Sequence, residues 1–436
     1  MPTLFLLLAA CAPTLPSAAV GETGDSAHTG GSETGTSADG VLDADTALET
    51  LEGDEASPAG LCQVSMVCGQ TIPDDPKIMC DLTIREDDGD AVYAGPAGVE
   101  LRGRSSLSAP KHQYSVELRD SAGADVSVNL FGMGADPDWV LNGMYYDRAL
   151  VRNALAFDLF RAMGPTRYAP EFRYCSLMLD GVWQGVYHLT ERPKIDDDRI
   201  AVADDADGGS FVVKQDHSDY LHESPLANGG WNIVSPGAPT AAQVAGIEAA
   251  LSGWESAALA NPATLGEHID LDAFADLVLL EEFMKNNDAF YLSLHLWKDT
   301  GGLIQISPWD LDLALGQPSY NDNENPHSWI AYRPALVTTL AQTDGWDARL
   351  ETRWAELRAG PFAEEAILSR IDGYQTTMGE SIETNFQTWP IDTIQFGSGY
   401  LYPVSSYAEE DARVRAWIQA RLAWMDDEVA RWGAGP

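Results

Sequence analysis

Basic residues are scarce in this chain. Its 436 residues include 26 lysines and arginines against 67 aspartates and glutamates, a formal net charge of −41, and only six residues are lysines. Nucleic acids and anionic membrane surfaces both require basic patches on the proteins that bind them. We therefore expect no nucleic acid partner and no membrane contact through charge.

Long apolar runs are also missing, because no segment approaches the roughly 20 apolar residues of a membrane-spanning helix. A short apolar run does precede Cys11, in the order Leu8-Ala9-Ala10-Cys11. This pattern resembles the lipobox of a bacterial lipoprotein, whose cysteine carries the lipid after signal cleavage. We expect residues 1–11 to be a lipoprotein signal peptide with lipidated Cys11; the alternative is an apolar start that arose by chance. The protein would then be exported, periplasmic or on the cell surface, and held at the membrane only by its lipid anchor.

Cysteine is scarce as well, with five residues in all. If Cys11 is lipidated, four remain, an even number that permits two disulfides in an exported protein. Three pairings are possible, and four buried free thiols are the alternative. No paired C-x2-C halves of a zinc ribbon occur, so these cysteines are not expected to bind metal. The four cysteines are Cys62, Cys68, Cys80 and Cys175.

Residues 12–60 contain no lysine, arginine or aromatic residue. Their Gly, Ser, Thr, Ala, Asp and Glu composition cannot bury enough apolar surface to offset the entropy of ordering. We expect a disordered acidic linker here. From Leu61 the composition is typical of a globular protein, and residues 61–436 are predicted to form one domain.

Hydrophobic periodicity predicts an α+β fold with a β-rich first half and a helix-rich second half. Helices are expected at 146–163, 271–285 and from 407 onward, the last with Ser406 and Glu409 in a capping-box pattern. A hairpin is expected at 291–306. Further strands are expected at 78–84, 99–101, 114–118, 174–179, 185–190 and 211–214.

Three aspartates have a spacing that suits phosphoryl transfer. Asp288 follows an apolar helix, Asp310 follows the predicted hairpin twenty-two residues further on, and Asp312 stands two residues after Asp310. Phosphoryl transfer needs one carboxylate to orient the attacking hydroxyl and others to hold Mg²⁺ on the phosphates. On one strand, Asp310 and Asp312 would face the same side. By spacing alone, the simpler interpretation is that these aspartates cap helices and turns.

A second candidate site is basic. The stretch Arg102-Gly103-Arg104-Ser105-Ser106 is followed by Lys111 just before a predicted strand. Glycine allows close backbone approach, serine offers donors, and Lys and Arg supply charge, which together suit an anion. The stretch is not a Walker A loop, and a solvated basic turn explains it equally well.

Two further segments place charges beside apolar runs, at 147–153 and 185–192. Each alone is most simply a structural salt-bridging segment. Two acidic clusters, at 196–207 and 321–325, lack the spacing of a calcium-binding EF-hand. We interpret these clusters as solvated loops.

In order, these segments resemble the motifs of the CotH (spore-coat protein H) kinase-like family. The matches are R-G-x-S-S…P-K-x-x-Y at 102–114, the acidic-to-R-N helix at 147–153, G-x-Y-x-L-x-E at 185–191, N-x-D…P-W-D-x-D at 286–312, and the closing helix at 407–426. Each motif is weak alone, but five in order over about residues 75–430 are fairly specific.

The resemblance implies an atypical protein-kinase-like fold that binds ATP and Mg²⁺ or Mn²⁺ and phosphorylates proteins. Asp288 then matches the catalytic aspartate and Asp310 the metal-binding aspartate, with Asp312 a second ligand or a neighbour. Lys111 and Arg102 match the basic segment, which implies contact with phosphate. The expected substrate is Ser or Thr of an exported or cell-surface protein.

One departure from the family pattern bears on activity. Many members have Asn five residues after the catalytic Asp, where this chain has Ser293, a poorer metal ligand. This difference keeps open a scaffold or adhesin that retains the fold without catalysis. A nucleotidyl-transferase, which would use the same carboxylates to move AMP, is the other alternative.

Overall fold

The computed structural model describes residues 61–434 except 88, 204, 217–219, 287, 318–321, 331–332 and 395–402. All described residues belong to one compact unit. The predicted signal peptide, the lipidation of Cys11 and the linker at 12–60 lie outside the described residues and stay predictions.

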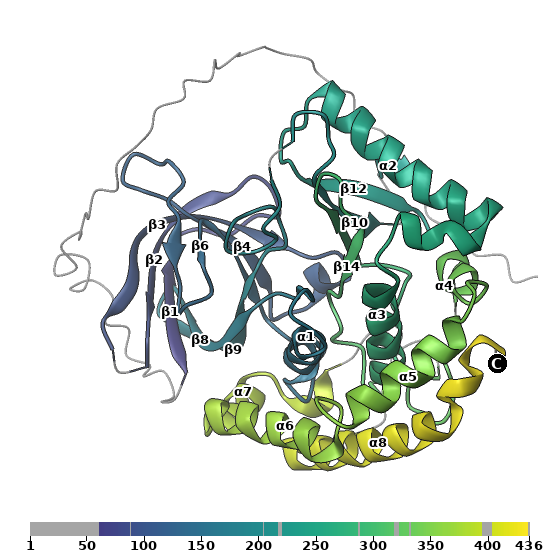
Figure 1. The fold of residues 1–436 in the computed structure, drawn as a ribbon. Coiled ribbons are helices and arrows are strands. Elements are labelled where there is room, and N and C mark those ends of the chain that lie inside the picture. Colours follow the sequence, from purple (N-terminus) through teal and green to yellow (C-terminus); the bar gives the residue numbers. More distant parts are fainter. Residues whose placement is uncertain are drawn as a thin grey trace, which may run out of the picture. The chain divides into compact units, whose positions relative to one another are not determined.

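The first sheet closes on itself through seven strands, in the order β1-β2-β3-β4-β7-β9-β8 (Figure 1). Neighbours are antiparallel except β1 and β8, whose parallel pairing completes the ring. In β1 every second side chain is buried, as the pleat of a strand requires. The strands are β1 (Cys62–Val67), β2 (Ile78–Arg85), β3 (Ala91–Arg102), β4 (Gln113–Leu118), β7 (Asp138–Asn142), β8 (Phe172–Leu179) and β9 (Val182–Glu191).

Two disulfides stabilise this sheet. Cys62 and Cys175 are directly opposite each other where β1 pairs with β8, and they are bonded. Cys68 and Cys80 form the second bond. Of the three pairings that the sequence left open, the structure contains this one.

A second sheet has the strand order β11-β12-β10-β13-β14. Its centre, β10 (Phe211–Asp216), pairs antiparallel with β13 (His295–Lys298), so strands from the two halves of the chain meet. The predicted hairpin is confirmed, although β13 begins four residues later than expected. The other strands are β11 (His222–Glu223), β12 (Gly230–Ser235), β14 (Gln305–Ser307) and the separate pair β5 (Val128–Asn129) and β6 (Ala135–Asp136).

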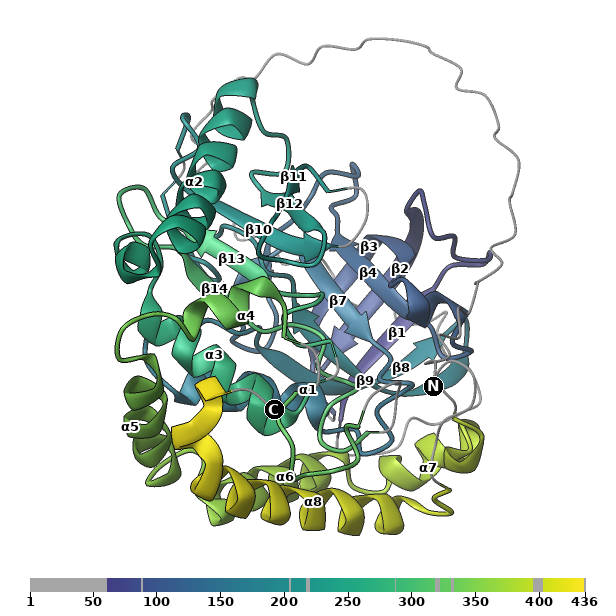
Figure 2. The same cartoon turned by 90° about the vertical axis from the view of Figure 1, so that its right-hand side faces the viewer.

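Eight α-helices are assigned in the described part of the chain. α1 and α3 pack against each other, and α8 runs alongside α6 (Figures 1 and 2). One large apolar core includes side chains from these four helices and from β10 and β13. The helices are α1 (Arg152–Ala162), α2 (Ala241–Ala260), α3 (Leu271–Met284), α4 (Ala335–Leu340), α5 (Trp346–Arg358), α6 (Glu364–Met378), α7 (Ser381–Thr388) and α8 (Tyr407–Glu428).

The α+β class is therefore confirmed, with differences at element ends. α1 begins at Arg152, not Tyr146, because Leu150 has φ 59° and the Asp147 carboxylate accepts the backbone N–H of Arg152. α8 has the predicted start, since the Ser406 side chain accepts the backbone N–H of Glu409. Among the helices of the described residues, none has the length and apolar character to cross a membrane.

Candidate active site

One cavity of about 900 Å³ gathers side chains from both sheets and from the loops after α3 and β14. Four of the five residues predicted for catalysis, metal or phosphate binding line it, namely Asp288, Asp310, Asp312 and Arg102. The fifth, Lys111, is not among the described residues that line the cavity. Arg102 ends β3, so this sheet delivers it directly to the cavity wall.

The three aspartates come from irregular segments. Asp288 follows α3 in a turn, where the Asn286 side chain accepts its backbone N–H at 3.3 Å. β14 ends at Ser307, so Asp310 and Asp312 do not lie on one strand. They reach the same cavity because Asp310 adopts φ 63° and the chain turns there.

Left-handed backbone residues concentrate around this cavity. Ser293 and Asp310, which line it, both have φ 63°, and Phe290 between the α3 end and Ser293 has φ 59°. Non-glycine residues in this region are strained and persist where the surrounding structure imposes them, often at functional sites. The strain marks these two loops as a candidate active site.

The carboxyl groups of the cavity repel one another. Desolvation, with repulsion from Asp288, raises the pKa of Asp310 to about 6, while Arg102 opposes the shift. The Asp310 side chain is open to the cavity, but protein atoms surround the cavity and limit its solvation. Desolvation and repulsion from Asp310 likewise raise the pKa of Asp312 well above its usual value. A cation bound between these groups would relieve the repulsion.

Four cationic side chains line the same cavity as these carboxylates, namely Arg102, Arg104, Arg192 and Lys214. Desolvation lowers the pKa of Arg102, and Asp310 partly offsets that. Asp216 lies 3.5 Å from Arg104 and 3.7 Å from Lys214 at the rim. In so acidic a protein, this grouping of positive charge with carboxylates favours a ligand that contains both an anion and a cation.

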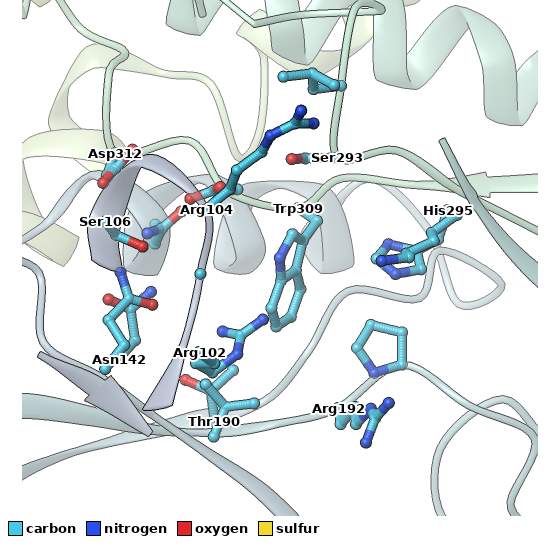
Figure 3. Close-up of a pocket in the computed structure, with 18 of the residues that line it drawn as sticks. Arg102, Arg104, Ser106, Asn142, Thr190, Arg192, Ser293, His295, Trp309 and Asp312 are labelled. Carbon is cyan, nitrogen blue, oxygen red and sulfur yellow. The ribbon is translucent and has the colours of Figure 1, made fainter. Parts of the chain in front are cut away.

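Aromatic and neutral polar groups complete the wall. The Trp309 ring has Arg102 over it at 5.5 Å and His295 against it edge-on at 5.8 Å (Figure 3). Burial lowers the pKa of His295 and His188 to about 3, so both rings are neutral at physiological pH. Both histidines retain a buried ring nitrogen without a hydrogen-bond partner in the described part of the chain.

Lys111 lies in a different place. It is 2% exposed, and its ammonium donates to Val186 O at 2.6 Å and to Asn385 Oδ1 at 2.9 Å. Asn385 Oδ1 also accepts the backbone N–H of Val186. We call Lys111, Gly185, Val186 and Asn385 the β9–α7 clasp. The motif residues of two predicted segments therefore meet in a contact that joins β9 to α7. The predicted phosphate contact of Lys111 stays a prediction.

The segment at 147–153 forms ion pairs, as its charge pattern indicated. Arg152 is fully buried and bonded to Asp147 at 2.5 Å and to Glu410 at 2.9 Å. Arg152 also donates to Ala314 O at 2.7 Å, so this segment reaches the loop that follows Asp310.

Sequence reasoning missed several lining residues. Arg104 belongs to the predicted basic stretch, whereas Asn153 and Arg192 lie in the charged segments at 147–153 and 185–192, whose motifs carried the signal. Lys214 and Asp216 had no such signal, because only the pairing of β10 with β13 brings them beside the loop after α3.

Comparison with known proteins agrees with the motif order. A sequence model of the family described as CotH kinase protein matches residues 99–425, well over half of the chain. The inner spore coat protein H of Bacillus subtilis (strain 168) is 23% identical over 188 residues, which cover 42% of this chain and 51% of that protein. The chain thus spans about half the length of this curated relative. The resemblance predicted from the motifs is confirmed, and the chain belongs to the CotH kinase protein family.

Proposed function

We propose that this protein transfers the γ-phosphoryl group of ATP to a serine or threonine of an exported or cell-surface protein. The observation that carries the proposal is the meeting of Asp288, Asp310 and Asp312 with Arg102 in one cavity of about 900 Å³. A cavity of this volume accommodates a nucleotide-sized ligand. Family membership supports the kinase-like chemistry.

Each residue has a role that follows from its chemistry. Asp288 orients the acceptor hydroxyl and takes its proton as the hydroxyl oxygen forms a bond to the γ-phosphorus. The bond between that phosphorus and the β–γ bridging oxygen breaks, and ADP leaves with the electron pair. Arg102 stabilises negative charge on the phosphoryl oxygens.

A divalent cation fits the donor set. The described residues contain no ready-made cluster of three or more His, Cys, Asp or Glu ligands. Mg²⁺ commonly uses only one or two protein carboxylates and takes its other oxygens from phosphates and water. Asp310 and Asp312 would hold Mg²⁺ or Mn²⁺, which would neutralise charge on the phosphates. The pKa values of both carboxyl groups are raised, and a bound cation would lower them by stabilising the ionised forms.

The fold supports a kinase-like arrangement as part of the same proposal. The closed β-sheet delivers Arg102, while the loops after α3 and β14 deliver the three aspartates from the other side of the cavity. Protein kinases likewise place their phosphate-binding strands and their catalytic loops on two sides of the nucleotide. We propose that these two parts correspond to kinase lobes.

We also propose that the protein works outside the cytoplasm, attached through lipidated Cys11. The two disulfides support this location because such bonds persist in oxidising compartments.

A non-catalytic scaffold is the second candidate, and Ser293 favours it. Ser293 lines the cavity, so the family's usual asparagine would have stood at the site itself. A serine hydroxyl is a weaker ligand for Mg²⁺ than an amide or carboxylate oxygen.

The test uses the full chain with Mg²⁺ or Mn²⁺ and ATP labelled at the γ or the α position. Casein and histone serve as generic acceptors, and label on the chain itself is also counted. We expect γ-label transfer by the wild type and by Asp347→Ala, a control at an exposed aspartate on α5. Asp288→Ala and Asp310→Ala should lose at least a hundredfold.

Each other outcome has a distinct meaning. Equal labelling by wild type, Asp288→Ala and Asp310→Ala would contradict the residue assignment. Transfer of α-label would indicate a nucleotidyl-transferase. If ATP gives no transfer of label and does not raise the melting temperature, the result favours the scaffold.

A further inference from the structure

The segment Asp147–Asn153 holds the loop that follows Asp310. Arg152 donates to Ala314 O at 2.7 Å and to Leu315 O at 3.5 Å. Asn153 Oδ1 accepts the backbone N–H of Leu311 at 2.6 Å. Three hydrogen bonds from two adjacent residues of α1 therefore fix the turn immediately beyond the Asp310 carboxylate.

The orientation of the Asn153 amide follows from chemistry. The group at Leu311 is an N–H donor, so the Asn153 atom facing it must be the oxygen. The other atom of the amide is then the NH₂ nitrogen, and this Nδ2 is buried with no partner among the described residues. Asn153 is 1% exposed, and it lines the cavity together with Asp310 and Asp312.

An unpaired donor this deeply buried is rare, because folding removes its water without a replacement acceptor. A ligand oxygen in the cavity would satisfy it. A metal ion cannot, because an amide N–H carries partial positive charge. Beside Arg102 and the three aspartates, an anionic oxygen of a cation-bound ligand would be an acceptor that suits the charges of the cavity.

We propose that Asn153 has two tasks: through Oδ1 it positions Asp310, and through Nδ2 it donates to a phosphate oxygen of the metal-bound ligand. The second task rests on the proposed function. Asn153 is thus a binding residue that the sequence motifs had placed only in a salt-bridging segment.

The first task explains how Asp310 keeps φ 63°. A non-glycine residue in the left-handed region returns to extended or helical backbone unless its neighbours prevent it. The bond from Leu311 N–H to Asn153 ties the residue after Asp310 to the rigid first turn of α1, which determines where the Asp310 carboxylate points.

Two substitutions separate the tasks. Asn153→Asp retains an oxygen for Leu311 N–H; in its ionised form it lacks the donor and adds a negative charge. Asn153→Ala lacks both. The matched control is Asn323→Asp: Asn323 is also buried and bonds to the same loop, at Leu313 O, but it is not among the residues that line the cavity.

The measurements use the full chain and simple probes at pH 8. Mn²⁺ binding is followed by electron paramagnetic resonance, pyrophosphate binding in saturating Mn²⁺ by calorimetry, and folding by melting temperature. For Asn153→Asp we expect undiminished Mn²⁺ affinity and pyrophosphate binding weakened at least tenfold, because one charge-assisted hydrogen bond is lost and the new carboxylate repels the anion. Asn153→Ala should weaken both, and Asn323→Asp should lower the melting temperature while both dissociation constants change less than twofold.

The inference and the proposed function can fail separately. Pyrophosphate binding by Asn153→Asp within twofold of wild type would overturn the donor role. A wild type that binds neither Mn²⁺ nor pyrophosphate would overturn the inference together with the proposed function. If pyrophosphate binding differs between wild type and the Asn153 variants as expected, but the wild type transfers no phosphoryl group, the inference is supported and only the proposed function is overturned.

Discussion

Replacing Gly185 by alanine tests the β9–α7 clasp, and with it the place of Lys111. Gly185 has φ 106°, and a Cβ at this position would lie 2.5 Å from Asn385 Oδ1 and 3.1 Å from Lys111 Nζ. Asn385 Oδ1 accepts from both Lys111 and the backbone of Val186, so it cannot retreat without breaking a buried hydrogen bond.

The magnitude has two parts. Forcing a side chain to a positive φ costs about 1–2 kcal/mol. Displacing the Asn385 amide leaves a buried donor unsatisfied, which costs about 1–3 kcal/mol more. We expect Gly185→Ala to lower the free energy of unfolding by about 2–5 kcal/mol.

The control is Gly123→Ala. Gly123 also has a positive φ, 85°, but its added Cβ would meet nothing within 4 Å. Gly123→Ala should lower the free energy of unfolding only by the cost of the positive φ, about 1–2 kcal/mol. The two variants should therefore differ by about 2 kcal/mol. Urea denaturation followed by tryptophan fluorescence, with both disulfides intact, measures the difference.

A result in which Gly185→Ala is no less stable than Gly123→Ala would refute the reasoning. The same preparations, with Lys111→Met added, also test the phosphate contact that the sequence predicted. If Lys111 serves the clasp, Lys111→Met lowers stability and leaves the dissociation constant for ATP in Mn²⁺ unchanged within twofold. If it contacts phosphate, ATP binding weakens about tenfold or more.

Two further predictions concern pH and redox state. Desolvation raises the pKa of buried Glu281 from 4.5 to about 8. Between pH 4.5 and 8 the folded chain therefore holds a proton on Glu281 that the unfolded chain releases. The free energy of unfolding then falls as the pH rises from 4.5 to 8, by at most about 1.4 kcal/mol per pH unit. Glu281→Gln, which mimics the neutral acid, should flatten that slope in denaturation curves taken from pH 5 to 8, and an unchanged slope would contradict the assignment. Cys62 and Cys175 are 113 residues apart, so replacing both by serine should lower the free energy of unfolding by about 5 kcal/mol. Cys68 and Cys80 are 12 residues apart, and the same replacement there should lower it by about 3 kcal/mol. Equal losses would contradict the argument that a disulfide stabilises by restricting the unfolded chain.

Local patterns predicted much of the secondary structure because they depend on near neighbours. The alternation at 114–118 and the apolar spacing at 271–284 appear as β4 and α3. Where a prediction missed an element end, a distant contact or an unusual backbone angle decided it. α1 starts late because the Asp147 carboxylate accepts the backbone N–H of Arg152, the first residue of the helix, and helical periodicity does not encode this contact.

The sequence also identified the three carboxylates, because their residue type, spacing and order among the motifs all match phosphoryl-transfer chemistry. It could not place Lys111, since a basic residue before a strand is compatible with either an anion site or a buried clasp. Packing against Asn385, which lies 274 positions along the chain, decided between these environments.

The sequence alone therefore determined the family, the α+β class and the identity of Asp288, Asp310, Asp312 and Arg102 as candidates, because these depend on residue type and order. Only the tertiary structure decided which side chains share the cavity, how the cysteines pair, and that Asn153 faces both Leu311 and the site. Those facts depend on contacts between residues far apart in the chain, and the chain's local pattern carries no record of them.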